Sequence, residues 1–120
     1  MIVVFADCVL RGNAFSPSAA AEATGLTFSE QSEPGTEYPH GEAELKYDDP
    51  SSQDAFYPLD SQLLTSLREH GPALRAAGAS EILLNFYVEH DGQCNMEMSP
   101  AWLRSIGELD VQVTRTTYRG

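Results

Sequence analysis

Residues 33–49, which read EPGTEYPHGEAELKYDD, hold six carboxylates, one histidine and one lysine. Groups of this kind can bind a divalent metal or transfer protons as general acids and bases. His40 and Glu42 are two positions apart and would share one side of a strand, so they are weak candidate ligands, with Asp48 or Asp49 as a third. Because no third ligand follows at a fixed spacing, we expect no metal, no cofactor and no catalytic residue here.

Two other positions could carry chemistry. Asp7 is the one carboxylate inside a strongly apolar run, and such a group must be paired, lie at a strand end, or be functional. The segment Glu-His-Asp at residues 89–91 is a second polar cluster, although polar residues are also what a hairpin turn requires. The two cysteines, Cys8 and Cys94, lie in apolar or alternating runs and are interpreted as reduced, half-buried thiols.

The positions of these candidate residues depend on the predicted strands and helices, beginning with the first strand and helix. Residues 2–10 are continuously apolar, which indicates an interior strand. Ser16 and Pro17 then provide the start signals of a short helix that Gly25 should end.

A polar segment separates this helix from the next strand. Residues 27–40 have no helical period and are predicted to form a long loop or a loose edge of the sheet. Residues 41–47 alternate strictly, which is typical of a half-buried strand. The inward side chains should be Ala43, Leu45 and Tyr47, and the outward ones Glu42, Glu44 and Lys46.

The second half of the chain predicts five further elements. Asp60 or Ser61 caps a helix that Gly71 and Pro72 should kink or split and that Gly78 should end. The strands that follow are predicted over residues 81–89, 93–98 and 109–118, with an Asp-Gly turn before the second and a short helix after Ser99-Pro100.

The resulting order is β-α-β-α-β-β-α-β in one α+β domain spanning residues 1–120, and it is ferredoxin-like (β-α-β-β-α-β) from about residue 41. We expect a single sheet with the helices packed on one face. The position of the first strand in that sheet is left open.

The charge distribution bears on the partner. The net charge is −11, and residues 1–60 carry eleven acidic and only two basic side chains. This balance argues against nucleic acid or an anionic membrane as a ligand and favours a cationic partner. The chain contains no apolar run long enough to span a membrane, so a cytoplasmic location is expected.

Two segments carry a family resemblance. An apolar strand followed by FSPSAAAEATGL, and the closing MSPAWLRSIGELDVQVTRTTY, place Ser-Pro before a helix and an aromatic residue at the end of the last strand. In these features the chain resembles a family of small bacterial domains catalogued as domain of unknown function 4279. That family has no established chemistry, so the resemblance implies a bacterial, non-enzymatic protein and assigns no functional residue.

The functional hypothesis is a protein-binding module and, more specifically, an immunity-type inhibitor of a cationic toxin or enzyme. In overall character the chain is similar to immunity proteins of bacterial toxin systems, many of which are small, acidic and cytoplasmic. The chain is expected to be a monomer or a homodimer. The expected partner-binding residues are acidic or aromatic: Glu37, Tyr38, Glu42, Glu44, Asp48, Asp49, Asp54, Phe56 and Tyr57.

Two alternatives stay open. The first is a small-molecule-binding or regulatory domain that uses an open sheet face, which a pocket lined by Tyr87, Trp102 and Met96 would favour. The second is a metal-dependent enzyme built on Asp7, His40 and Glu42, or on the turn at residues 89–91.

Overall fold

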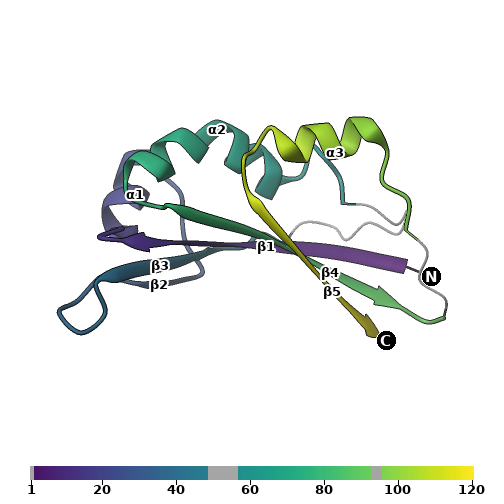
Figure 1. Ribbon diagram of the computed structural model, residues 1–120, viewed down its shortest axis with the longest axis horizontal. Helices are drawn as coiled ribbons and strands as arrows, with labels where there is room; N and C mark the ends of the chain where they lie inside the picture. The colour runs from purple at the N-terminus through teal and green to yellow at the C-terminus, as the bar shows by residue number, and fades with distance from the viewer. Residues whose placement is uncertain (1, 49–56, 93–95) are drawn as a thin grey trace.

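The described strands belong to one sheet. The structure is a computed structural model, and it describes residues 2–48, 57–92 and 96–120. In these ranges the chain forms a single mixed sheet of five strands and three helices, which confirms the α+β class. The three helices lie along the same face of the sheet (Figure 1).

The strands are paired around a central strand. The elements are β1 (Ile2–Asn13), α1 (Pro17–Thr24), β2 (Glu30–Ser32), β3 (His40–Leu45), α2 (Gln62–Ala76), β4 (Glu81–His90), α3 (Pro100–Gly107) and β5 (Gln112–Arg119). Their order across the sheet is β2-β3-β1-β4-β5. Strand β1 pairs antiparallel with β3 on one side and with β4 on the other, whereas β4 and β5 are parallel. The predicted interior strand is therefore the middle strand of the sheet.

Each helix begins at a serine cap. The hydroxyls of Ser16, Ser61 and Ser99 accept hydrogen bonds from the backbone N–H groups of Ala19, Leu64 and Trp102. Gly25 ends α1 in the left-handed conformation, with a φ of 76°. Helix α2 runs without a break through Gly71 and Pro72, so the predicted split does not occur.

The core lies between the sheet and the helices. Alternate side chains of β1 and β4 are buried under the helices, and they are Val4, Ala6, Cys8, Leu10, Ile82, Leu84, Phe86 and Val88. Leu63, Leu64, Leu67 and Leu74 of α2 cover them. Burial raises the pKa of the Cys8 thiol to about 12, with the charge of Asp7 adding to the effect, so Cys8 is an unreactive core residue. Cys94 lies outside the described residues.

The order of elements differs from the expected one after β4. Residues 96–98, predicted as part of a returning strand, lie outside any strand, and β5 pairs directly with β4. The described residues therefore do not follow the expected ferredoxin-like order. Met96 and Met98 do pack against the core, as their alternation indicated. A loop that runs beneath α3 can bury alternate side chains just as a strand does, and this is why the pattern misled.

The two edge strands differ in how far they follow the expectation. Residues 27–40 were predicted as a long loop or a loose edge, and Glu30–Ser32 pair with β3 as the short edge strand β2. All three side chains of β2 are exposed, so no alternation marked it. Strand β5 begins at Gln112, and its eight residues are all exposed, whereas residues 109 and 111, expected on its core face, pack against the core before the strand begins.

A pair of glycines lets two loops approach the sheet. Gly12 of β1 and Gly41 of β3 are cross-strand partners. A Cβ atom at Gly41 would overlap the carbonyl group of Phe15, and one at Gly12 would overlap the carbonyl oxygen of Gly78. The connection into α1 and the connection out of α2 therefore cross the sheet where it has no side chains.

We predict that Gly41→Ala destabilises the protein by about 1–3 kcal/mol, because the backbone at Phe15 must move to admit the methyl group. Gly35→Ala is the matched control, since nothing lies within 4 Å of its Cβ position. Urea unfolding followed by circular dichroism measures both. Equal unfolding midpoints for the two variants would show that the close approach at Gly41 does not exist in solution.

Candidate functional site on the open face of the sheet

The sheet has one face that no described helix covers (Figure 1). We call it the open face. It carries the side chains of β1 and β4 that alternate with the core residues. They are Val3, Phe5, Asp7, Val9 and Arg11 of β1 and Leu83, Asn85, Tyr87 and Glu89 of β4, and all nine are half-buried. Antiparallel sheets with one solvated face usually carry polar residues there, so this apolar content is unusual.

Three aromatic rings form the centre of the open face. The ring of Phe5 lies 6.5 Å from that of Tyr87 and 6.4 Å from that of Tyr118, measured between centroids. These residues come from three adjacent strands, β1, β4 and β5. Amphipathic aromatic side chains held on a sheet are rigid, and such residues are the usual anchors of protein interfaces.

Asp7 lies beside these rings in a polar network. The side-chain amide of Asn85 donates to Asp7 Oδ1 at 2.9 Å, and the Tyr87 hydroxyl donates to the same carboxylate at 3.3 Å. Thr114 in turn donates to Asn85 Oδ1 at 2.5 Å. Asp7 is thus held by neutral donors from the neighbouring strand, and within the described residues it forms no ion pair.

The pKa of Tyr87 is raised above its usual value. Partial burial is the largest cause, followed by the charge of Asp7, the hydrogen bond to Asp7 and the charge of Glu44. The causes other than burial come from Asp7 and Glu44, so two carboxylates lie close enough to the Tyr87 hydroxyl to disfavour its ionised form.

Carboxylates also border the open face along β3 and β2. Glu42 is exposed and Glu44 is half-buried, and they lie across from Arg11 and Val9 of β1. Glu30 pairs with Glu44 from the edge strand β2. Arg11 is already paired, since its Nε donates to Glu81 at 2.6 Å. On this side of the face Glu30, Glu42 and Glu44 outnumber Lys46, the exposed base that follows β3.

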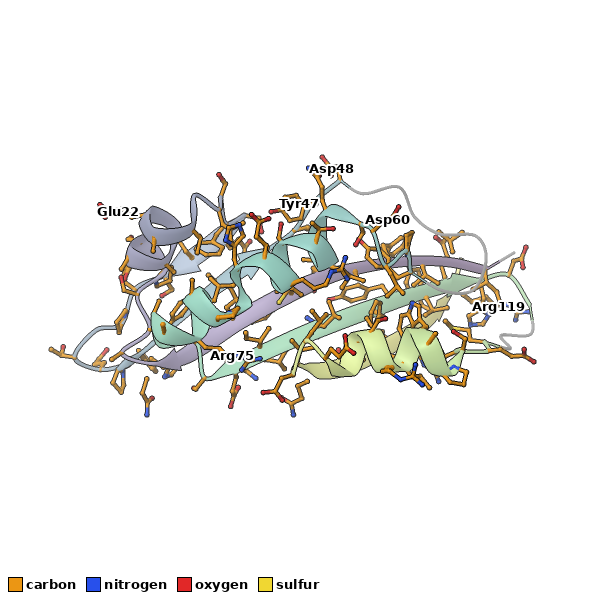
Figure 2. The ribbon with its side chains drawn as sticks, turned by 90° about the horizontal axis from the view of Figure 1, so that it is seen from above. Glu22, Tyr47, Asp48, Asp60, Arg75 and Arg119 are labelled. Carbon is orange, nitrogen blue, oxygen red and sulfur yellow. The ribbon has the colours of Figure 1, made fainter. Side chains whose placement is uncertain are left out.

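The structure separates the residues expected to bind a partner. Glu42 and Glu44 lie on the open face, whereas Glu37 and Tyr38 lie in the connection between β2 and β3. Asp48 follows β3 and points outward beside the start of α2 (Figure 2). Asp49, Asp54 and Phe56 lie outside the described residues. Among the described members of this set, Glu42 and Glu44 are the two on the open face.

Tyr57 needs a correction, because its side chain is only 2% exposed and belongs to the core. Its ring packs edge-on against Phe86, and its carbonyl oxygen accepts a hydrogen bond from Trp102 Nε1 at 3.0 Å. An aromatic residue next to a polar loop was interpreted as a surface anchor, but here it fixes the chain to the sheet. The open-face residues Phe5, Asn85 and Tyr118 were not singled out, and the apolar outer face of β1 was the signal for them.

Glu33, from the carboxylate-rich stretch, has a structural role. Its two carboxylate oxygens accept hydrogen bonds from the Ser18 backbone N–H at 2.8 Å and from the Ser16 hydroxyl at 2.9 Å. These bonds lower the pKa of Glu33, the Ser18 bond most strongly. Glu33 thus tethers the segment after β2 to the N-terminus of α1.

The candidates for metal and acid–base chemistry do not converge. His40 and Glu42 both lie on β3, but the described residues contain no group of three or more His, Cys, Asp or Glu side chains that could hold a metal. His90 Nδ1 lies 2.8 Å from the carbonyl oxygen of Gly92, within the turn that follows β4.

In the described ranges no helix has the length and apolar character needed to cross a bilayer.

Comparison of the chain with protein-family models, with curated proteins and with solved structures found no match. The resemblance to the bacterial family of unknown function stays a prediction.

We predict that Asp7→Asn lowers the pKa of Tyr87. The tyrosinate is an anion, so the Asp7 carboxylate disfavours it, and removing that charge makes ionisation easier while burial continues to oppose it. The measurement is an NMR titration of protein labelled at tyrosine Cζ, with Tyr87→Phe to assign the signal. Glu69→Gln on α2 is the control. An unchanged Tyr87 titration in Asp7→Asn would mean that the two side chains are not in contact in solution.

We also predict that Glu33→Gln lowers the melting temperature at neutral pH. Because the folded-state pKa of Glu33 is depressed, its stabilisation is present above the unfolded pKa and is lost as the pH falls through the folded pKa. The difference between the variant and the wild type should therefore shrink in acid. Glu37→Gln, a neighbouring exposed carboxylate, should leave the melting temperature nearly unchanged. A Glu33→Gln difference that persists to low pH would contradict the role of the charge.

Proposed function

We propose that the protein is a protein-binding module whose open face takes up a cationic partner. The observation that supports this most directly is the cluster of Phe5, Tyr87 and Tyr118, which lies on a sheet face without helical cover and beside the Asp7 carboxylate. A partner that covered the rings would bury apolar surface, which stabilises a complex by about 25 cal/mol per Å² before the costs of association.

The carboxylates would have a different role. Glu42 and Glu44 border the rings, and border charges mainly set the rate of association and the choice of partner. The overall net charge of −11 would add a long-range attraction for a basic surface. This division between apolar anchors and acidic border argues for a protein partner with Lys or Arg side chains around an apolar patch.

The finer proposal is an immunity-type inhibitor of a cationic toxin or enzyme in a bacterial cytoplasm. The acidic character and the small size support it. It assigns no catalytic residue to this chain, since the protein would act by covering its partner.

We predict that Glu42→Gln combined with Glu44→Gln slows association with the partner roughly tenfold at low salt and that the difference disappears at high salt. Phe5→Ala should instead speed dissociation, because it removes an apolar anchor. The measurement is surface plasmon resonance with a basic protein that has first been shown to form a stable complex with the wild-type chain.

The matched control is Glu69→Gln combined with Glu108→Gln, which removes the same charge from exposed positions on α2 and after α3. If both double variants slow association equally, net charge and not the open face attracts the partner. If neither pair changes the rate and Phe5→Ala has no effect, the open face is not the binding surface.

Small-molecule binding remains a second candidate because a pocket is present. Trp102 and Met96 do line a pocket, as that alternative required. The pocket lies on the helix-covered face, however, while Tyr87 lies on the open face, so the two sides of the sheet must be considered separately.

A further inference from the structure

An apolar pocket lies between α3 and the sheet, on the side opposite the open face. Its volume is about 150 Å³, comparable with an engineered apolar cavity that admits benzene. Phe86, Trp102, Ile106, Met96 and Met98 line it. The residues come from β4, from α3 and from the segment that leads into α3, so the pocket is formed where the last helix meets the sheet.

The aromatic wall of the pocket is held in place. Trp102 Nε1 donates to the carbonyl oxygen of Tyr57 at 3.0 Å, and the Trp102 and Phe86 rings lie 5.6 Å apart between centroids. Met96 and Met98 are only partly buried, and methionine side chains adapt readily to the shape of an aromatic group. The pocket therefore has a rigid aromatic side and an adaptable thioether side.

The rim of the pocket is also apolar, except at one position. Leu103 and Val113 line the pocket, and their side chains are 51% and 47% exposed, which is unusual for residues of this type. An occupant that covered them would remove apolar surface from water. The opening thus favours a ligand whose apolar part reaches from the interior to the rim.

Arg115 is the charged residue that lines this pocket. It lies on β5 opposite Phe86, and within the described residues its side chain forms no hydrogen bond or ion pair. Glu97, the acidic residue between the two methionines, lines a separate groove next to Pro58. A guanidinium group without a partner at the rim of an apolar pocket is suited to a carboxylate, which it can bind through two parallel hydrogen bonds.

We propose that this pocket binds a small carboxylic acid with an aryl or short alkyl body, which enters beneath α3 while its carboxylate pairs with Arg115. The proposal does not rest on the protein-binding role of the open face, because none of the residues that line the pocket belongs to that face.

The experiment uses the full chain and Trp102, which is the only tryptophan in the sequence and lies in the pocket wall. Titration with 3-phenylpropanoate should give a saturable change in tryptophan fluorescence. The matched alcohol, 3-phenylpropan-1-ol, should bind more weakly, because it keeps the aryl group but lacks the charge.

Three variants locate the site. Arg115→Gln should weaken 3-phenylpropanoate binding by about tenfold and leave the alcohol unchanged, since a charge-assisted hydrogen bond is lost. Arg104→Gln, an exposed arginine on α3 that does not line the pocket, should change neither. Val113→Phe should abolish binding of both compounds by filling the rim.

The proposal is overturned by any of three results. The first is no saturable signal up to 10 mM, a range in which even a ligand with a Kd of about 1 mM would saturate. The second is an equal loss of affinity in Arg115→Gln and Arg104→Gln, which would indicate a general charge effect. The third is unchanged binding in a folded Val113→Phe variant, which would place the ligand elsewhere.

Discussion

The structure depends on the position of β1 as the middle strand of the sheet. β1 pairs with β4 along Ile2–Arg11 and with β3 along Cys8–Asn13, so it satisfies backbone hydrogen bonds on both of its edges. Pairing on both edges fixes which side chains of β1 face the helices and which face the other way. The side chains of β1 that face the helices belong to the core, and those on its other side lie on the open face.

Local signals predicted the parts of the fold that depend on local chemistry. The serine caps, Gly25 and the strict alternation in β3 each act within a few residues, and each was confirmed. The errors arose where long-range pairing decides the structure. Strand β2 is a strand because it pairs with β3, and Met96 and Met98 are partly buried because they pack against the core outside any strand. Neither condition is visible in the neighbouring residues.

The candidate site was predictable only in part for the same reason. Alternation placed Glu42 and Glu44 on the outward side of β3, and the structure agrees. What lies beside them depends on strand order, which brings Asp7 of β1 next to Asn85 and Tyr87 of β4. Asp7 is 78 residues from Asn85 and 80 residues from Tyr87 in the sequence, so charge counting along the sequence could not identify the aromatic cluster beside it.

The short third helix explains why the helix-covered side also retains an accessible site. At about 1.5 Å per residue, the eight residues of α3 reach only about 12 Å, whereas the eight residues of β5 extend about 26 Å. Trp102 and Ile106 cover the sheet beneath α3, but Val113 and Arg115 lie at the margin of that cover. A longer helix would close the pocket over β5. The length of α3 therefore determines both the exposure of the last strand and the presence of an apolar opening beside Arg115.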